Sequence, residues 1–114
     1  MTALPAAGTA VADLILVHEP LPADEVVSGA PTTAIAVIDD TGDREIGVWE
    51  MTPGVATDTE ADELFVVLSG RATIAFEDPS LPDLEVGPGS VVRLADGMRT
   101  TWTVTETLRK VYIA

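Results

Sequence analysis

Turn signals recur about every 8 to 12 residues along this chain, and their cadence restricts the fold more than any other feature of the sequence. Clusters of Gly, Pro, Asp and Ser interrupt the apolar runs, as in DDTGD, EVGPGS and ADG. The runs between them are rich in Val, Ile and Thr, which favour pleated sheets. No run sustains an apolar period of 3.6 residues, so any helix is limited to a turn or two near residues 22–28. The pattern predicts an all-β sandwich or barrel.

The β-prone runs between the turn signals are the predicted strands. They cover residues 14–18, 33–38, 45–51, 63–68, 71–76, 90–95, 99–105 and 108–114. The stretch DELFVVLSGRATIAFED holds two of them, separated by a Ser-Gly pair that favours a hairpin. TET, between the last two runs, is interpreted as another turn.

The length of 114 residues predicts one domain with a modest core. Residues 1–32 are predicted to form an N-terminal arm and the first strand or strands, and residues 33–114 the barrel itself. The first ten residues are interpreted as a loose or domain-exchanging arm. The chain has no cysteine, which excludes disulfides and thiol chemistry and fits a reducing compartment.

Charge and hydropathy restrict the partners. The formal net charge is −13, so nucleic acid and anionic membranes would be repelled. The sequence offers no apolar stretch long enough for a membrane span and no signal peptide, so we expect a cytoplasmic protein. Residues 90–114 are locally basic. Their bases either offset acids on neighbouring strands or meet an anionic ligand.

Alternation along the strands predicts which side chains share the interior, because successive side chains of a strand point to opposite faces. Glu63 shares a face with Phe65, and Trp102 shares a face with Thr100. If these faces and that of Trp49 point inward, they enclose a pocket with a few polar groups in apolar walls. We therefore predict that Glu63 is a catalytic candidate and that the aromatic residues and Thr100 contact a ligand.

The end of the chain presents two candidate bases for the interior. Arg109 and Lys110 are adjacent in an extended run, so one points inward and the other outward. The core-seeking residues Val111 and Ile113 favour Arg109, whereas Tyr112, a plausible pocket wall with a polar tip, favours Lys110. Alternation alone leaves this choice open. Lys110 is the more attractive partner for Glu63, and Tyr112 is the fifth predicted ligand-binding residue.

Two glycine-framed motifs resemble those of the cupin superfamily of small β-barrels. Glu63 followed by six residues and Gly70 resembles the end of the first cupin motif, and Gly89 with Gly97 resembles the frame of the second. Over roughly residues 33–114 the chain is similar to the single-domain cupins related to ureidoglycine aminohydrolase and the ethanolamine-utilisation cupin. The resemblance implies an all-β, single-domain cupin (jelly-roll) barrel.

The resemblance also implies metal ligands that this sequence lacks. The histidine slots of the first motif fall on Thr57 and Thr59, or on Ala56 and Asp58 with a longer spacer, and that of the second falls on Thr100. The one histidine, His18, lies far upstream and is interpreted as structural. The acids at 58, 60 and 62 are interpreted as a solvated loop at the barrel mouth. We predict no metal and no cofactor.

Three functions remain open from the sequence. The first is metal-independent binding of a small polar or carboxylate-bearing molecule in the barrel. The second is a metal-free enzyme for proton transfer or hydrolysis, with Glu63 as acid or base, Lys110 as its electrostatic partner and Tyr112 as a possible donor. The third is an interaction module with a filled barrel. A homodimer is predicted, because the N-terminal strands could add to a neighbour's sheet edge.

Overall fold

The computed structural model describes residues 8–114, and most of the first ten residues, interpreted as a loose or domain-exchanging arm, therefore lie outside the described residues. One short 3-10 segment, η1, precedes the strands. The bounds are η1 Val11–Asp13, β1 Glu19–Pro20, β2 Val26–Ser28, β3 Thr32–Asp40, β4 Glu45–Met51, β5 Gly54–Thr59, β6 Glu63–Phe76, β7 Leu84–Val86, β8 Val91–Leu94 and β9 Arg99–Ile113. No helix among residues 8–114 is long and apolar enough to cross a membrane.

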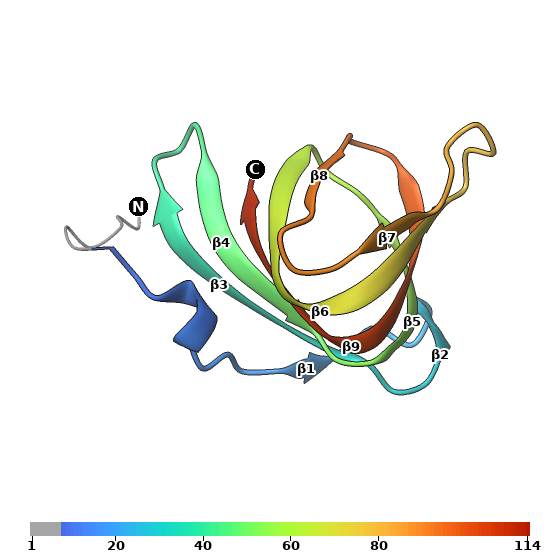
Figure 1. The fold of residues 1–114 in the computed structure, drawn as a ribbon, viewed down its shortest axis with the longest axis horizontal. Helices are drawn as coiled ribbons and strands as arrows, with labels where there is room; N and C mark the ends of the chain where they lie inside the picture. Colours follow the sequence, from blue (N-terminus) through green and yellow to red (C-terminus); the bar gives the residue numbers. More distant parts are fainter. Residues whose placement is uncertain (1–7) are drawn as a thin grey trace.

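The antiparallel sheet curls into a jelly-roll β-barrel around strand β9 (Figure 1). One path through the sheet runs in the order β1-β3-β4-β9-β5-β2, while β6 pairs with β7, β8 and β9. The first half of β9 pairs with β5 and the second half with β4, and β6 lies along its other edge. This topology lets β9 contribute side chains to the interior from both of its halves, on either side of the exposed residues 105–107. The all-β prediction is confirmed.

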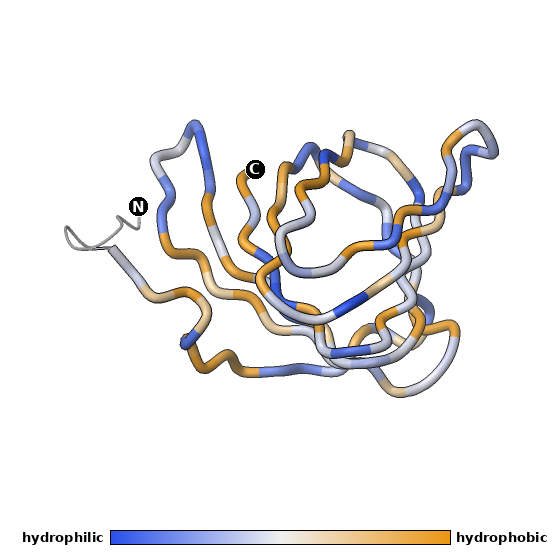
Figure 2. The backbone as a smooth tube through the Cα atoms, viewed as in Figure 1, coloured by the Kyte–Doolittle hydropathy of each residue, from blue (hydrophilic) through white to orange (hydrophobic). Residues whose placement is uncertain are grey.

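The buried core of the barrel consists mainly of aliphatic side chains. Met51, Ile74 and Leu108 are almost completely buried, and Phe65 and Trp102 join them in one contiguous cluster. Hydrophilic and hydrophobic residues alternate along the strands, and the β3–β4 turn is strongly hydrophilic (Figure 2). This is the period-two pattern of a sheet with one face on the core and the other in water.

Strand β6 is continuous through the Ser-Gly pair, so the predicted hairpin is wrong. Both halves of β6 pair with β9, and the register shifts between Val67 and Ala72. Gly70 has a φ of 90°, and a Cβ there would collide with the backbone of Thr107. The pair therefore bends one long strand across a bulge instead of reversing it. The turn predicted at TET is also wrong, because β9 runs through it.

Two further differences concern strands near the N-terminal half. Residues 14–18 do not form the predicted strand, and Ile15 is 97% exposed because no neighbouring strand covers it. Strand β5 was not among the predicted strands, since VATDT carries few large apolar residues. It is held in the sheet by pairing with β9 over residues 54–59. Tertiary pairing here overrides weak local propensity.

Candidate functional site

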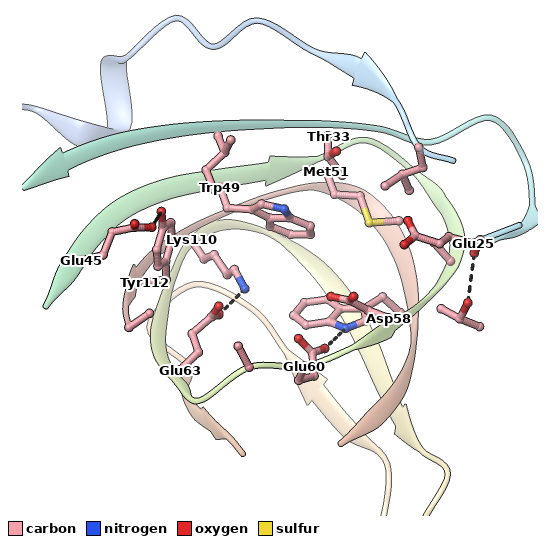
Figure 3. A pocket seen from close by; sticks show the side chains of 17 residues that line it. Glu25, Thr33, Glu45, Trp49, Met51, Asp58, Glu60, Glu63, Lys110 and Tyr112 are labelled. Carbon is pink, nitrogen blue, oxygen red and sulfur yellow. Dashed lines mark hydrogen bonds and ion pairs between the residues drawn. The ribbon is translucent and has the colours of Figure 1, made fainter. Parts of the chain in front are cut away.

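A cavity of about 330 Å³ lies inside the barrel, where β3, β4, β5, β6 and β9 converge (Figure 3). Apolar side chains such as Trp49, Met51 and Trp102 form much of its wall. Its ionisable acidic and basic side chains are Glu25, Glu45, Asp58, Glu60, Glu63 and Lys110. The combination of apolar walls and a few polar groups is typical of small-molecule sites.

Both tryptophans line this cavity, on the faces that alternation predicts. Their ring centroids are 5.5 Å apart with an interplanar angle of 58°, a tilted arrangement. Trp102 is buried, whereas Trp49 is only half-buried. Ala56, which pairs opposite Trp102 between β5 and β9, also lines the cavity. The indoles therefore give the cavity rigid apolar walls.

The carboxylate of Glu63 and the ammonium of Lys110 form an ion pair in the interior. The distance from Lys110 Nζ to Glu63 Oε2 is 2.5 Å. The same Nζ lies 4.2 Å from the ring centroid of Phe65, 4.7 Å from that of Trp49 and 5.0 Å from that of Trp102. Lys110 is only 5% exposed. Three aromatic faces and one carboxylate thus replace the water that would otherwise solvate this ammonium.

Arg109, the neighbouring base, faces the other side of the sheet. Its Nε donates to Glu50 over 2.7 Å, and its Nη1 donates to the carbonyl of Val11 over 2.9 Å. His18 Nε2 also contacts Glu50, at 2.7 Å. The structure therefore places Lys110, not Arg109, in the interior. Arg109, Glu50 and His18 instead fasten the segment before β1 to the outside of the barrel.

The contacts with Arg109 and His18 on the outside of the barrel lower the pKa of Glu50. Burial raises the pKa of its carboxyl, but the hydrogen bonds and positive charges of Arg109 and His18 outweigh burial and hold the pKa below the ordinary value of 4.5. His18 Nδ1 also lies 2.9 Å from the hydroxyl of Thr32. The interpretation of His18 as a structural residue agrees with these contacts.

Tyr112 lines the cavity with its hydroxyl held by an acid. The hydroxyl donates to Glu45 Oε2 over 2.6 Å. Burial, the hydrogen bond to Glu45 and the charge of Glu63 raise the pKa of the phenol, so the hydroxyl stays protonated. Gly47 pairs with Tyr112 across β4 and β9, and any Cβ there would overlap the ring. This glycine creates the space that the phenol occupies.

Glu60 is a site residue that the sequence analysis assigned to a solvated loop, and that interpretation is wrong for it. It is 7% exposed and accepts hydrogen bonds from Thr100 Oγ1 at 2.6 Å and from Trp102 Nε1 at 3.0 Å. Alternation gives the wrong direction for Glu60 because β5 ends at Thr59. Beyond the end of a strand, successive side chains no longer point to opposite faces. The carboxylate fixes the indole that walls the cavity.

Asp58 lies beside Glu60 at the cavity wall. Burial, the negative charge of Glu60 and a hydrogen bond with Glu60 raise the pKa of Asp58 to about 6. Asp58 itself is exposed, whereas Glu60 is buried, so the pair lies at the edge of the cavity. Ionising both acids places like charges side by side there, which is unfavourable.

Two of the predicted ligand-binding residues lie behind the cavity wall. Phe65 is 1% exposed, and its ring centroid lies 5.7 Å from that of Trp102. Thr100 is buried and donates to Glu60. Both support lining residues rather than line the cavity themselves, and their contact with a ligand stays a prediction.

The interior donors do not match those of a transition-metal site. Ala56 and Asp58 line the cavity at two of the histidine slots, and Thr100 occupies another. Glu63 is engaged by Lys110. Within residues 8–114, no group of three or more His, Cys, Asp or Glu side chains is arranged to hold a metal ion. These residues do not fit the metal that the cupin resemblance implies.

A family model described as the EutQ-like cupin domain matches residues 38–112. This range covers every strand that lines the cavity except the first part of β3. No curated protein matches the chain.

Several solved structures share the fold. A protein of unknown function from Pseudomonas syringae pv. tomato is 27% identical with a TM-score of 0.74; the match covers 89% of this chain and 44% of that protein. A protein of unknown function from Rhizobium leguminosarum is 25% identical, with a TM-score of 0.63 and coverages of 71% and 78%. EutQ from Clostridium difficile is 16% identical, with a TM-score of 0.62 and coverages of 73% and 61%. The chain thus spans less than half the length of the Pseudomonas protein.

Proposed function

The chain belongs to the family of EutQ-like cupin domains, and on this premise we propose that it binds a small polar molecule inside its barrel without a metal ion. The observation that carries the proposal is the cavity of about 330 Å³ lined by Trp49 and Trp102. Small-molecule sites are typically concave and mostly apolar, and their volumes begin at about 300 Å³. The cavity has this size and character.

The interior donors support metal independence. A divalent transition metal needs several converging imidazole, thiolate or carboxylate ligands. Glu63 is the ligand position that this chain retains from the cupin motif, and its carboxylate is already paired with Lys110. A ligand would therefore be held by hydrogen bonds, charge and contact with the indoles.

A second candidate is a metal-free enzyme for proton transfer or hydrolysis. It is supported by the raised pKa of Asp58, about 6, since acids and bases with a pKa near the working pH transfer protons most efficiently. The Glu63–Lys110 pair, predicted from the sequence as the acid-base group, lies on the same cavity. The cavity volume disfavours the third candidate, a filled barrel.

The test is a screen of small molecules of every charge type by quenching of tryptophan fluorescence, before and after dialysis against a chelator. We expect at least one compound to give a saturable response that the chelator leaves unchanged. The response should be lost in Trp102→Ala, with circular dichroism to show that the variant folds. Trp49→Phe, at a half-buried position, is the second variant and should change the amplitude.

Two results would overturn the proposal: the absence of any saturable response across the screen, or binding that requires a stoichiometric metal. Glu106→Gln is the control, because this glutamate pairs with Arg71 on the surface and both side chains are mostly exposed. Product formation from a bound compound, retained binding but lost turnover in Glu63→Gln, or the same pattern in Asp58→Asn, would favour the enzyme.

A further inference from the structure

We infer that the ligand of this cavity carries a positive charge and belongs to the class of compact organic ammonium compounds. The inference rests on the proposed function and names the ligand class of the same site. It follows from three features of the interior: an ammonium that is already held there, carboxylates without a basic partner among residues 8–114, and aromatic walls.

The cavity wall already holds an ammonium, that of Lys110. Its Nζ is surrounded by the rings of Phe65, Trp49 and Trp102 within 5.0 Å of their centroids, and Glu63 neutralises its charge. An ammonium over an aromatic face is attracted by the ring quadrupole, and most strongly where water is excluded. The contacts of Lys110 therefore indicate that the interior can stabilise an organic cation from which water has been removed.

Other carboxylates on the cavity have no basic partner on its described lining. Lys110 is the base among the described lining residues, and it is bonded to Glu63. The acids left over are Glu25, Glu45, Asp58 and Glu60. The bonds that Glu45 and Glu60 accept from side chains come from neutral groups, the hydroxyls of Tyr112 and Thr100 and the indole of Trp102. Neutral donors orient these carboxylates and leave their charge uncompensated.

These groups surround one space. Figure 3 shows the carboxylates of Asp58, Glu60 and Glu63 and the ring of Trp49 around the same part of the cavity. A ligand ammonium there would meet negative charge on one side and an aromatic face on the other. Its positive charge would also relieve the repulsion between Asp58 and Glu60.

For an anionic ligand, electrostatic repulsion would exceed attraction. It would be repelled by the unpaired carboxylates and, during approach, by the chain's net charge of −13. Among the described lining residues, Lys110 alone could attract it, and Glu63 would have to release that ammonium first. The cavity therefore disfavours the carboxylate-bearing ligands that the sequence left open.

The experiment compares three probes of nearly equal shape and different charge: choline, 3,3-dimethylbutan-1-ol and 3,3-dimethylbutanoate. Binding is followed in two-dimensional ¹H–¹⁵N spectra at mildly alkaline pH, where Asp58 is ionised. The reporter is the indole N–H of Trp102, which donates to Glu60, and Trp49→Phe assigns the two indole signals. We expect choline to bind about tenfold more tightly than the alcohol, since a partly buried charge contact is worth at least that factor.

Matched variants locate the charge. Glu60→Gln and Asp58→Asn each remove one negative charge with little change in shape, and each should weaken choline binding about tenfold while leaving the alcohol unchanged. Glu106→Gln changes the net charge by the same amount at an exposed site and should have no effect. Retained dispersion in the spectra shows that each variant folds.

The outcomes separate this inference from the proposed function. If the alcohol or the carboxylate binds as tightly as choline, or if Glu106→Gln weakens choline binding as much as Glu60→Gln does, the ligand class is wrong while small-molecule binding stands. If none of the probes moves either indole signal, the inference is also overturned. The proposed function then fails only if the fluorescence screen yields no compound of any charge.

Discussion

Lys110→Met removes the ammonium from the interior while keeping most of the side chain's length and apolar stem. The carboxylate of Glu63 then loses its partner in a space lined by aromatic rings. Loss of one member of a buried pair is far more costly than replacement of both, because an isolated charge remains away from water. The substitution should therefore destabilise the fold more than removal of an exposed positive charge such as that of Arg99.

The magnitude follows from the burial of the two partners. The side chain of Lys110 is 6% exposed and that of Glu63 is 18% exposed. Breaking a fully buried pair costs about 3–5 kcal/mol, and the partial exposure of Glu63 points to the lower end, about 3 kcal/mol in the free energy of unfolding. For a domain of this size that corresponds to a fall in Tm on the order of 10 °C.

A double-mutant cycle measures the coupling by urea denaturation. The variants are Lys110→Met, Glu63→Gln and the pair together, and the double variant should be clearly more stable than Lys110→Met alone. Arg99 and Glu77 form the control pair, with Nε and Oε2 2.9 Å apart and side chains 70% and 66% exposed. Arg99→Met should cost less than about 1 kcal/mol.

One result would refute the reasoning. If Lys110→Met costs less than about 1 kcal/mol and the cycle shows no coupling with Glu63, the pair behaves like the exposed control pair. The interior would then be open to water, and the arguments from dry carboxylates and aromatic faces would fail with it.

Three further predictions concern packing, pH and assembly. Gly47→Ala should lower the free energy of unfolding by about 1–3 kcal/mol, because the added methyl group overlaps the ring of Tyr112; urea denaturation measures it, and an unchanged midpoint would contradict the packing. The pKa of Glu50 is lowered in the folded state, so the stability it contributes is present above its ordinary pKa of 4.5 and is lost as the pH falls below that value. Glu50→Gln should therefore flatten the acid side of a stability–pH curve, and an unaltered curve would show that Arg109 gives this acid no net stabilisation. The homodimer stays a prediction: Ile35 is 62% exposed on β3, so Ile35→Lys should shift light-scattering mass from dimer to monomer, and a wild-type monomer at all concentrations would exclude it.

The fold class could be predicted from local chemistry. Period-two alternation indicated which residues share a face with Trp49 and with Trp102, and on the assumption that these faces point inward it predicted that both rings meet in one interior. Both tryptophans line the cavity. Alternation is a property of any extended chain, so it needs no knowledge of the partner strand. The prediction of a hairpin at Gly70 is wrong because a Ser-Gly pair is compatible with either a turn or a β-bulge. The close approach of Thr107 on β9, which the sequence does not show, decides that a bulge forms.

The candidate site could be predicted in part. Alternation placed Glu63 on the same face as Phe65, and the structure shows that this face points into the barrel. It also shows that Lys110, and not Arg109, is the interior partner of Glu63. Arg109 and Lys110 are adjacent bases that point to opposite faces of β9. Which of the two faces is buried depends on the register between β9 and its neighbouring strands, and the sequence does not give that register. Glu60 was missed because it follows the end of β5, where the chain leaves the regular alternation.

The sequence by itself determined the all-β class, the absence of cysteine and of the cupin histidines, and the acidic character of the chain. These are properties of residue types and of spacing along one chain. Tertiary structure alone decided that β9 pairs along both of its edges, that Lys110 and not Arg109 faces the interior, and that Glu60 reaches Trp102 across 42 positions of sequence. The physical reason is that burial and charge compensation depend on neighbours in space, which the closure of the sheet brings together.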